Sequence, residues 1–270
     1  MDKKSFPRSL LLSLVLAFAA LLLPLNWVFA DEVIDLRQQL ISRISLLEGD
    51  ASVRHRGSQN WEEAGINLPL AAGDSIYTGR NSRLELQVYL LFIRLSEDTS
   101  LEAVELSPNR YRFNLSLGTA TFSAEDEIKE FEISTPRAAV LIKKAGVYRI
   151  NVLPNGDTEV VTLTGETELI SDNGSRIKLK EGKKATFGSD PSDVEISATY
   201  ISDYWDGWNQ ERDNLLKISS DTDRYISRNG YLYGNSDLDA YGNWVNVPGH
   251  GWSWQPRNVG VGWSPYRIGR

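Results

Sequence analysis

The stretch that decides the fold runs from Leu68 to Val88, L-P-L-A-A-G-D-S-I-Y-T-G-R-N-S-R-L-E-L-Q-V. Gly73-Asp74 predicts a tight corner, because glycine adopts backbone angles that other residues resist and aspartate bonds its own turn. A short strand over Ser75–Thr78 follows, and then a turn. Residues 83–88 then alternate, which predicts a half-buried strand. Its apolar face would hold Leu84, Leu86 and Val88, and its polar face Arg83, Glu85 and Gln87.

A short apolar approach, a glycine and an alternating strand recur five times between residues 43 and 190. The glycines are Gly49, Gly73, Gly118, Gly165 and Gly182. Five similar corners predict a sheet turned repeatedly in one sense, as in a β-roll or flattened β-helix. A two-sheet sandwich is the competing architecture. Asn155-Gly156 and Asn173-Gly174 each lie between two strand-like runs, which predicts type I′ hairpins.

Residues 43–190 resemble the FecR-type domain, whose members carry a G-D-x-I-x-T-G-x-x-S-x-x-x-L corner. The matching residues are Gly73, Asp74, Ile76, Thr78, Gly79, Ser82 and Leu86. The segment I-S-T-P-R-A-A-V (133–140) is similar to the family's V-x-T-P-x-G-x-x, with Ala138 where the family often has glycine. The resemblance implies a mainly β domain that works in protein–protein contact.

FecR-type domains also occur in transmembrane regulators that relay a surface signal to a sigma factor. That mechanism requires a cytoplasmic N-terminal domain, and here only residues 1–9 precede an apolar run. We therefore expect the relay half to be missing, and a signalling regulator is the weaker interpretation.

Length, net charge and cysteine content limit the domain number, the partners and the kinds of site that this chain can have. The 270 residues suffice for one large or two ordinary domains. The formal net charge of −7 argues against a nucleic-acid partner. The absence of cysteine excludes disulfides, thiolate zinc sites, a cysteine nucleophile and a lipidated N-terminal cysteine.

The N-terminus has the three parts of an export signal. Lys3, Lys4 and Arg8 precede the apolar run 10–23, and small residues end at Ala30 before an acidic start. This pattern predicts a signal peptide over 1–30 and a periplasmic or secreted mature protein. The alternative is an uncut anchor, which would be the chain's one contact with a membrane. Residues 31–42 form a lead-in segment with apolar positions near helical spacing.

Residues 191–230 contain glycine only at Gly207 and Gly230, and the pattern predicts a linker with one amphipathic helix. The helix is predicted over about 203–217, with Asp203 or Ser202 as its cap. We expect its aromatic stripe to face the β domain as core. The recurring apolar residues are Tyr200, Tyr204, Trp205, Trp208, Leu215 and Leu216.

Residues 231–270 form a Trp/Tyr-rich region, in which small strands joined by tight turns would use aromatic rings as their core. It resembles a region of unknown function that follows FecR-type domains in some secreted bacterial proteins. The matching segments are L-D-A-Y-G-N-W (238–244), P-G-H-G-W-S-W-Q-P (248–256) and G-W-S-P-Y-R-I-G-R (262–270). Such regions usually continue further, so this one is expected to be either naturally short or incomplete.

No residue set predicts catalysis, a metal or a cofactor. The two histidines, His55 and His250, lack a nucleophile motif and zinc spacing. Asp237 and Asp239 are interpreted as turn formers rather than calcium ligands. The chain is therefore predicted not to be an enzyme, with an uncharacterised hydrolase as the least favoured alternative.

The aromatic tail holds the candidate binding residues, because indole and phenol faces stack on sugars and cations. The candidates are Trp244, Trp252, Trp254, Trp263, Tyr266 and Arg257. The competing interpretation makes these aromatics core residues of a small module. The favoured function is a secreted envelope scaffold for protein interaction. The alternative is a cell-wall or glycan-binding module.

Overall fold

The computed structural model describes residues 40–190, 194–197, 200–217, 222, 225 and 234–264. The chain divides into two compact units, 1–36 and 37–270. The predicted signal segment, most of the lead-in segment and Tyr266 lie outside the described residues. Among the described helices, none is long and apolar enough to span a membrane.

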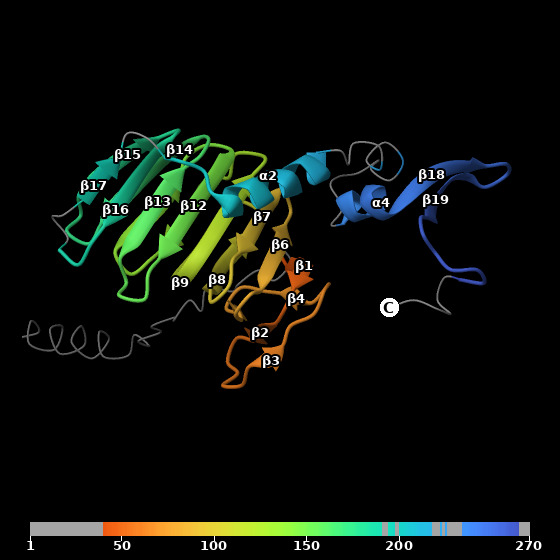
Figure 1. Cartoon of the computed structure of the whole chain (residues 1–270), viewed down its shortest axis with the longest axis horizontal. Coiled ribbons are helices and arrows are strands. Elements are labelled where there is room, and N and C mark those ends of the chain that lie inside the picture. Colours follow the sequence, from red (N-terminus) through yellow and green to blue (C-terminus); the bar gives the residue numbers. More distant parts are fainter. Residues whose placement is uncertain are drawn as a thin grey trace, which may run out of the picture. The chain divides into compact units, whose positions relative to one another are not determined.

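The mainly β fold class is confirmed (Figure 1). One layer, sheet A, contains β1 (Ser42–Glu48), β4 (Pro69–Leu70), β6 (Arg83–Val88), β7 (Leu91–Leu95), β12 (Gly146–Val152), β13 (Thr158–Thr162), β16 (Lys183–Phe187) and β17 (Val194–Ser197). The other layer, sheet B, contains β2 (Ala51–Arg54), β3 (Glu62–Glu63), β5 (Ser75–Thr78), β8 (Ser100–Ser107), β10 (Glu130–Ser134), β11 (Ala138–Ile142), β14 (Glu166–Ser171) and β15 (Arg176–Lys180).

The long strand β9 (Arg110–Ala124) belongs to both layers. Its first half pairs with β8 and β10 in sheet B, and its second half pairs with β7 and β12 in sheet A. The β9–β10 pair is parallel, and the other pairs are antiparallel. The order in sheet A is β4-β1-β6-β7-β9-β12-β13-β16-β17. In sheet B it is β3-β2-β5-β8-β9-β10-β11-β14-β15.

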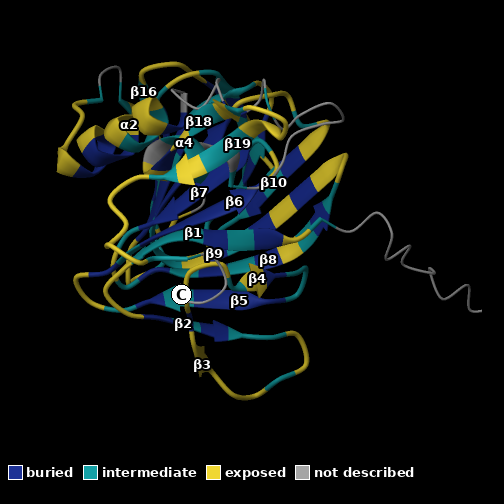
Figure 2. Ribbon diagram, turned by 90° about the vertical axis from the view of Figure 1, so that its right-hand side faces the viewer, coloured by how far each residue is buried: buried dark blue, intermediate teal, exposed yellow. Residues whose placement is uncertain are grey.

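The core lies between the two layers. Phe122 of the sheet A half of β9 contacts Phe113 and Phe131 of sheet B, with ring centroids 5.7 and 5.9 Å apart. Figure 2 shows the buried residues gathered on the strands of both layers. Successive hairpins alternate between the layers, since β12–β13 and β16–β17 lie in sheet A while β14–β15 lies in sheet B. The fold thus combines the winding of a roll with the face-to-face packing of a sandwich.

Each of the five predicted corner glycines lies where the chain passes from one layer to the other. All five have positive φ, between +72° and +94°. At Gly118, within β9, a side chain is also excluded by space, because a Cβ atom would lie 2.3 Å from Thr99 Oγ1. The periodic glycines therefore mark layer crossings, as left-handed backbone and close approach require.

The two Asn-Gly hairpins are present, but their predicted turn type is wrong. In the β12–β13 loop the Gly156 amide donates to the Leu153 carbonyl at 2.8 Å, and only Gly156 has positive φ. A type I′ turn needs positive φ at both central residues, which are Pro154 and Asn155 here. Proline has a fixed negative φ. The β14–β15 loop has the same arrangement, with Gly174 bonded to Ser171.

The prediction that β6 is half-buried is also wrong. Glu85 and Gln87, assigned to a solvent-facing side, have no exposed surface. Glu85 is covered by helix α2 (Tyr204–Lys217), which lies on the outer face of sheet A. Gln87 accepts hydrogen bonds from Arg43 and from the Gly234 amide. Figure 2 shows both buried and exposed residues along α2.

Helix α2 agrees closely with its predicted bounds. The Asp206 amide donates to Asp203 Oδ1 at 3.1 Å, so Asp203 is the N-cap. Trp205, Trp208 and Leu216 are buried. The buried stripe is narrower than predicted, because Tyr204 and Leu215 are 80% and 53% exposed.

The C-terminal region forms a hairpin of β18 (Gly242–Val247) and β19 (Gly251–Pro256). A short helix that the sequence did not predict, α4 (Asn235–Tyr241), precedes it.

Candidate functional site

A row of polar residues crosses the outer face of sheet A. The strand register places Glu85 of β6 opposite Arg94 of β7, Arg94 opposite Thr121 of β9, and Thr121 opposite Arg149 of β12. Glu85, Arg94 and Thr121 are fully buried. A buried row of this kind needs partners, because unpaired polar groups are costly away from water.

Helix α2 supplies those partners at intervals of three or four residues along one face. The Trp205 indole donates to Thr121 Oγ1 at 2.9 Å, and Arg94 donates to the Asn209 carbonyl at 3.1 Å. Arg212 Nη2 lies 2.8 Å from Glu85 Oε1. Because residues spaced by one turn share a helix face, α2 matches the row across four strands.

Opposite charges are paired within this contact, which we call the α2 interface. Arg94 contacts Glu85 at 2.8 Å and Asp213 at 2.7 Å. Burial alone would raise the pKa of Glu85, but a hydrogen bond from Arg212 and the charge of Arg94 hold that pKa below its usual value. Burial alone would lower the pKa of Arg149, but Asp203, Tyr200 and Asp206 raise that pKa above its usual value. Glu85 and Arg149 therefore stay charged at neutral pH.

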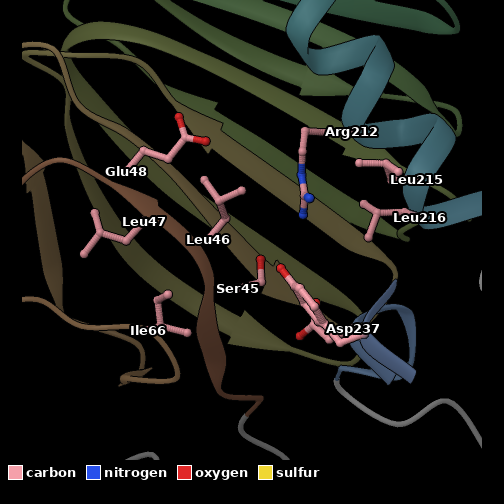
Figure 3. A pocket seen from close by; sticks show the side chains of 10 residues that line it. Ser45, Leu46, Leu47, Glu48, Ile66, Arg212, Leu215, Leu216 and Asp237 are labelled. Atoms are coloured by element: carbon pink, nitrogen blue, oxygen red, sulfur yellow. The ribbon is translucent and has the colours of Figure 1, made fainter. Parts of the chain in front are cut away.

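A groove of about 320 Å³ lies beside this interface (Figure 3). We call it the β1–α2 groove, and it is lined by Ser45, Leu46, Leu47, Glu48, Ile66, Arg212, Leu215, Leu216, Asp237 and Tyr241. Figure 3 shows Ser45 and Leu46 on one side and Arg212, Leu215 and Leu216 of α2 across from them.

Apolar side chains line much of the groove and reach solvent. Ile66, Leu215 and Tyr241 are 60%, 53% and 67% exposed. Exposed apolar residues gathered in one concave place are typical of a contact surface, whereas single ones are not.

The ionised residues of the groove are already paired inside the chain. Arg212 contacts Glu85 at 2.8 Å, and Glu48 pairs with Arg83 of β6. Asp237 of α4 lies 2.6 Å from Arg43 of β1. The groove is therefore polar at its rim but has little charge left to attract an ion.

One strand edge borders the groove. Strand β4 pairs with β1 only at Ser42 and Arg43, and Ile44 bonds to Leu68 and Asn67 in the loop before β4. Beyond Ile44, the described residues give β1 a backbone partner only in β6. Among the described residues, the segment Ser45–Glu48 thus has one edge without a backbone partner.

A second cavity, of about 440 Å³, lies on the other side of α2 beside Val147 and Leu163. Its carboxylates already have partners in the chain. Asp203 and Asp206 bind Arg149, at 2.8 and 3.2 Å, and Asp213 binds Arg94. The carboxylates of both cavities are thus paired, and the β1–α2 groove differs in having the exposed apolar residues Ile66, Leu215 and Tyr241.

The structure brings three of the candidate aromatic residues together on one face of the β18–β19 hairpin. Trp244 lies opposite Trp254, and Trp252 lies opposite Asn246. Tyr225 packs on the rings of Trp244 and Trp252, with centroids 5.3 and 4.4 Å away.

Several of these groups hold the module itself together. The Trp244 indole donates to Thr222 Oγ1, and the Trp254 indole donates to the Leu238 carbonyl, each at 2.8 Å. Arg257 donates to the Gly242 carbonyl just beyond the end of α4. Trp252 is half exposed and Trp263 is partly exposed. A glycan-binding role for these residues stays a prediction.

Both histidines lie in loops. His55 Nδ1 lies 3.1 Å from Asp74 Oδ2, while the same carboxylate accepts the amides of Arg56 and Ala71 and so fixes the corner. His250 is exposed in the β18–β19 turn. The described part of the chain contains no cluster of three His, Asp or Glu residues suited to a metal ion.

Sequence reasoning missed both the α2 interface and the β1–α2 groove. The available signal was a pair of opposite charges, Glu85 and Arg94, inside two strands whose other residues are mostly apolar. Charges are rarely fully buried unless they are paired, so two such charges in adjacent strands indicate a covered face.

Two solved structures are similar to this chain. No family model matches the chain, and no curated protein matches it. Two crystal structures, at 2.50 and 1.65 Å resolution and each described as "a putative anti-sigma factor from Parabacteroides distasonis", are similar to it with 16% sequence identity and a TM-score of 0.43. The similarity covers 62% of this chain and 88% or 89% of the other. At this TM-score it carries no functional argument, and the FecR-type resemblance stays a prediction.

Proposed function

We propose that this chain is an exported, non-enzymatic scaffold that holds an extended segment of a protein partner in the β1–α2 groove. The observation that carries the proposal is the free edge of β1 beside an exposed apolar wall.

The unpaired edge of β1 would bind the main chain of the partner segment. An unpaired strand edge presents N–H and C=O groups in a row, and an added strand satisfies them. The segment Ser45–Glu48 spans four residues, which matches the short contact of a single added strand.

The apolar wall supplies selectivity. Side chains of an added strand alternate between two faces, so every second one would meet Ile66, Leu215 or Tyr241. Because Arg212, Glu48 and Asp237 are already paired, the preferred side chains are apolar rather than charged. We therefore infer a neutral, alternating apolar segment as the occupant.

Export is part of the proposal, and it rests on the basic, apolar and small-residue pattern of residues 1–30. The partner would then be a protein of the periplasm or cell surface.

The test is peptide selection against the folded full chain. Random seven-residue peptides are selected on the wild type and then measured on Leu215→Glu and on Ile201→Glu. Ile201 is 84% exposed and lies outside the groove, so it controls for an added carboxylate at an exposed apolar position. We expect alternating apolar peptides that lose at least about tenfold in affinity on Leu215→Glu and keep it on Ile201→Glu. Peptides that bind Leu215→Glu as tightly as wild type would overturn the proposal.

A further inference from the structure

The segment that runs from β15 into β16 is the most basic short stretch of an acidic chain. Residues 176–184, R-I-K-L-K-E-G-K-K, hold five basic residues and one acidic residue, whereas the whole chain has a net charge of −7. This local excess of positive charge is opposite in sign to the net charge of the chain, so the position of the segment in the fold is of interest.

That position is the open edge of sheet B. Among the described strands, β15 pairs with β14 alone, from Glu166 opposite Lys180 to Ile170 opposite Arg176. Its residues alternate, with Arg176, Lys178 and Lys180 exposed on the outer side. Ile177 and Leu179 face the core between the layers. The edge of β15 away from β14 thus presents backbone N–H and C=O groups, and the outer face of the strand carries a row of basic side chains.

Lys178 and Lys180 lie opposite glutamates that are already paired with other residues. Glu168, which lies opposite Lys178, is bound by Arg176 at 3.0 Å and by Lys143 at 3.3 Å. Glu166, which lies opposite Lys180, pairs with Lys144 at 3.3 Å. Within the described residues, neither Lys178 nor Lys180 has an ion pair.

We propose that β15 is a second docking edge, which accepts an extended acidic segment of a protein partner as the next strand of sheet B. In such a strand, acidic side chains lie opposite the exposed lysines and apolar side chains lie beside Ile177 and Leu179. The partner motif is therefore an alternation of acidic and apolar residues, unlike the neutral apolar segment proposed for the β1–α2 groove.

The charge ladder also opposes pairing of this edge with the same edge of a second copy of the chain. Two β15 edges brought together would place like charges opposite each other, which is destabilising. Lysines on edge strands commonly prevent unwanted pairing in this way. The same ladder attracts a strand of opposite charge, so protection and selection come from the same residues.

The experiment measures binding of labelled peptides to the full chain by fluorescence anisotropy. The probe is the blocked peptide T-E-V-E-V-E-T, and T-E-E-E-V-V-T has the same composition without alternation. The protein variants are Lys178→Glu/Lys180→Glu and a charge-matched control, Arg80→Glu/Lys129→Glu, whose side chains are exposed outside β15. Hydrogen exchange of residues 176–180 reports whether the peptide pairs with the backbone.

We expect the alternating peptide to bind wild type and control alike, and to bind the β15 variant at least about tenfold more weakly. Binding should also slow exchange over 176–180. Because all four lysine and arginine positions are exposed, the variants should keep the wild-type unfolding midpoint, which is checked in parallel.

Three results would overturn the proposal. The first is equal binding of the non-alternating peptide, which would indicate attraction to any anion. The second is equal binding to the β15 variant. The third is binding of anionic phospholipid vesicles through the lysines without any binding of the peptide, which would indicate a membrane surface instead. None of these results bears on the β1–α2 groove, because the two edges belong to different sheets.

Discussion

The substitution Glu85→Gln removes one charge from the centre of the α2 interface and keeps the shape of the side chain. In the wild type, Glu85 accepts hydrogen bonds from Arg94 Nε and Arg212 Nη2, both at 2.8 Å, and from Ser45 Oγ at 2.7 Å. After the change, Arg94 keeps only Asp213 as a charged partner, although it is fully buried.

The expected cost follows from burial. Removing one partner of a buried ion pair typically destabilises a protein by about 3–5 kcal/mol, because the remaining charge stays away from water. We therefore expect Glu85→Gln to lower the free energy of unfolding by about 3 kcal/mol or more. Urea titration measures this loss, followed by far-UV circular dichroism and by tryptophan fluorescence, since Trp205 and Trp208 stack in α2.

The matched control is Glu130→Gln, which breaks the exposed pair between Glu130 and Arg110. Because solvent screens that pair, the urea unfolding midpoint of Glu130→Gln should stay at the wild-type value within error. If Glu85→Gln is no less stable than Glu130→Gln, the charges of the α2 interface do not hold the helix and the reasoning is refuted.

Three further outcomes follow from the same structure. Because the folded-state pKa of Glu85 is lowered from 4.5, its contribution is present above that pH and lost as pH falls below it, so acid should destabilise wild type more steeply than Glu85→Gln in pH-dependent urea titrations. Gly118→Ala should lower the melting temperature by several degrees, since φ is +89° and a Cβ would meet Thr99; an unchanged melting temperature would mean that this crossing is not constrained. Trp254→Ala should loosen the C-terminal module, seen as faster hydrogen exchange over 242–256, because its indole is bonded to α4. Trp252→Ala, at a half-exposed ring packed on Tyr225, should have a smaller effect, and equal effects would contradict this difference.

Local sequence signals predicted the elements whose causes are local. The five corner glycines were found because positive φ and a short apolar approach are properties of a few adjacent residues. The start of α2 was found for the same reason, since Asp203 caps its own helix. The hairpin turn type was missed at Pro154-Asn155, where the Asn-Gly signal was given more weight than the fixed φ of proline.

The candidate site depends on contacts between distant residues, and no local signal determines them. Glu85 looked solvent-facing because its covering residue, Arg212, follows 127 positions later. Helix α4 has no strong periodicity. Its C-terminal end is bound by Arg257, which donates to the Gly242 carbonyl, and its middle by Trp254, which donates to the Leu238 carbonyl. The positions of Arg257 and Trp254 in space would have to be known before the helix could be predicted.

The most direct measurement of the central claim is site-specific photo-crosslinking in the cells that produce the protein. A photoreactive amino acid replaces Leu215 in the β1–α2 groove, or Ile201 outside it, and adducts are detected on gels. The account predicts a polypeptide adduct from position 215 that is absent from position 201 and disappears when Ile66→Glu is added across the groove. No adduct from position 215, or an adduct that Ile66→Glu leaves unchanged, would contradict the account.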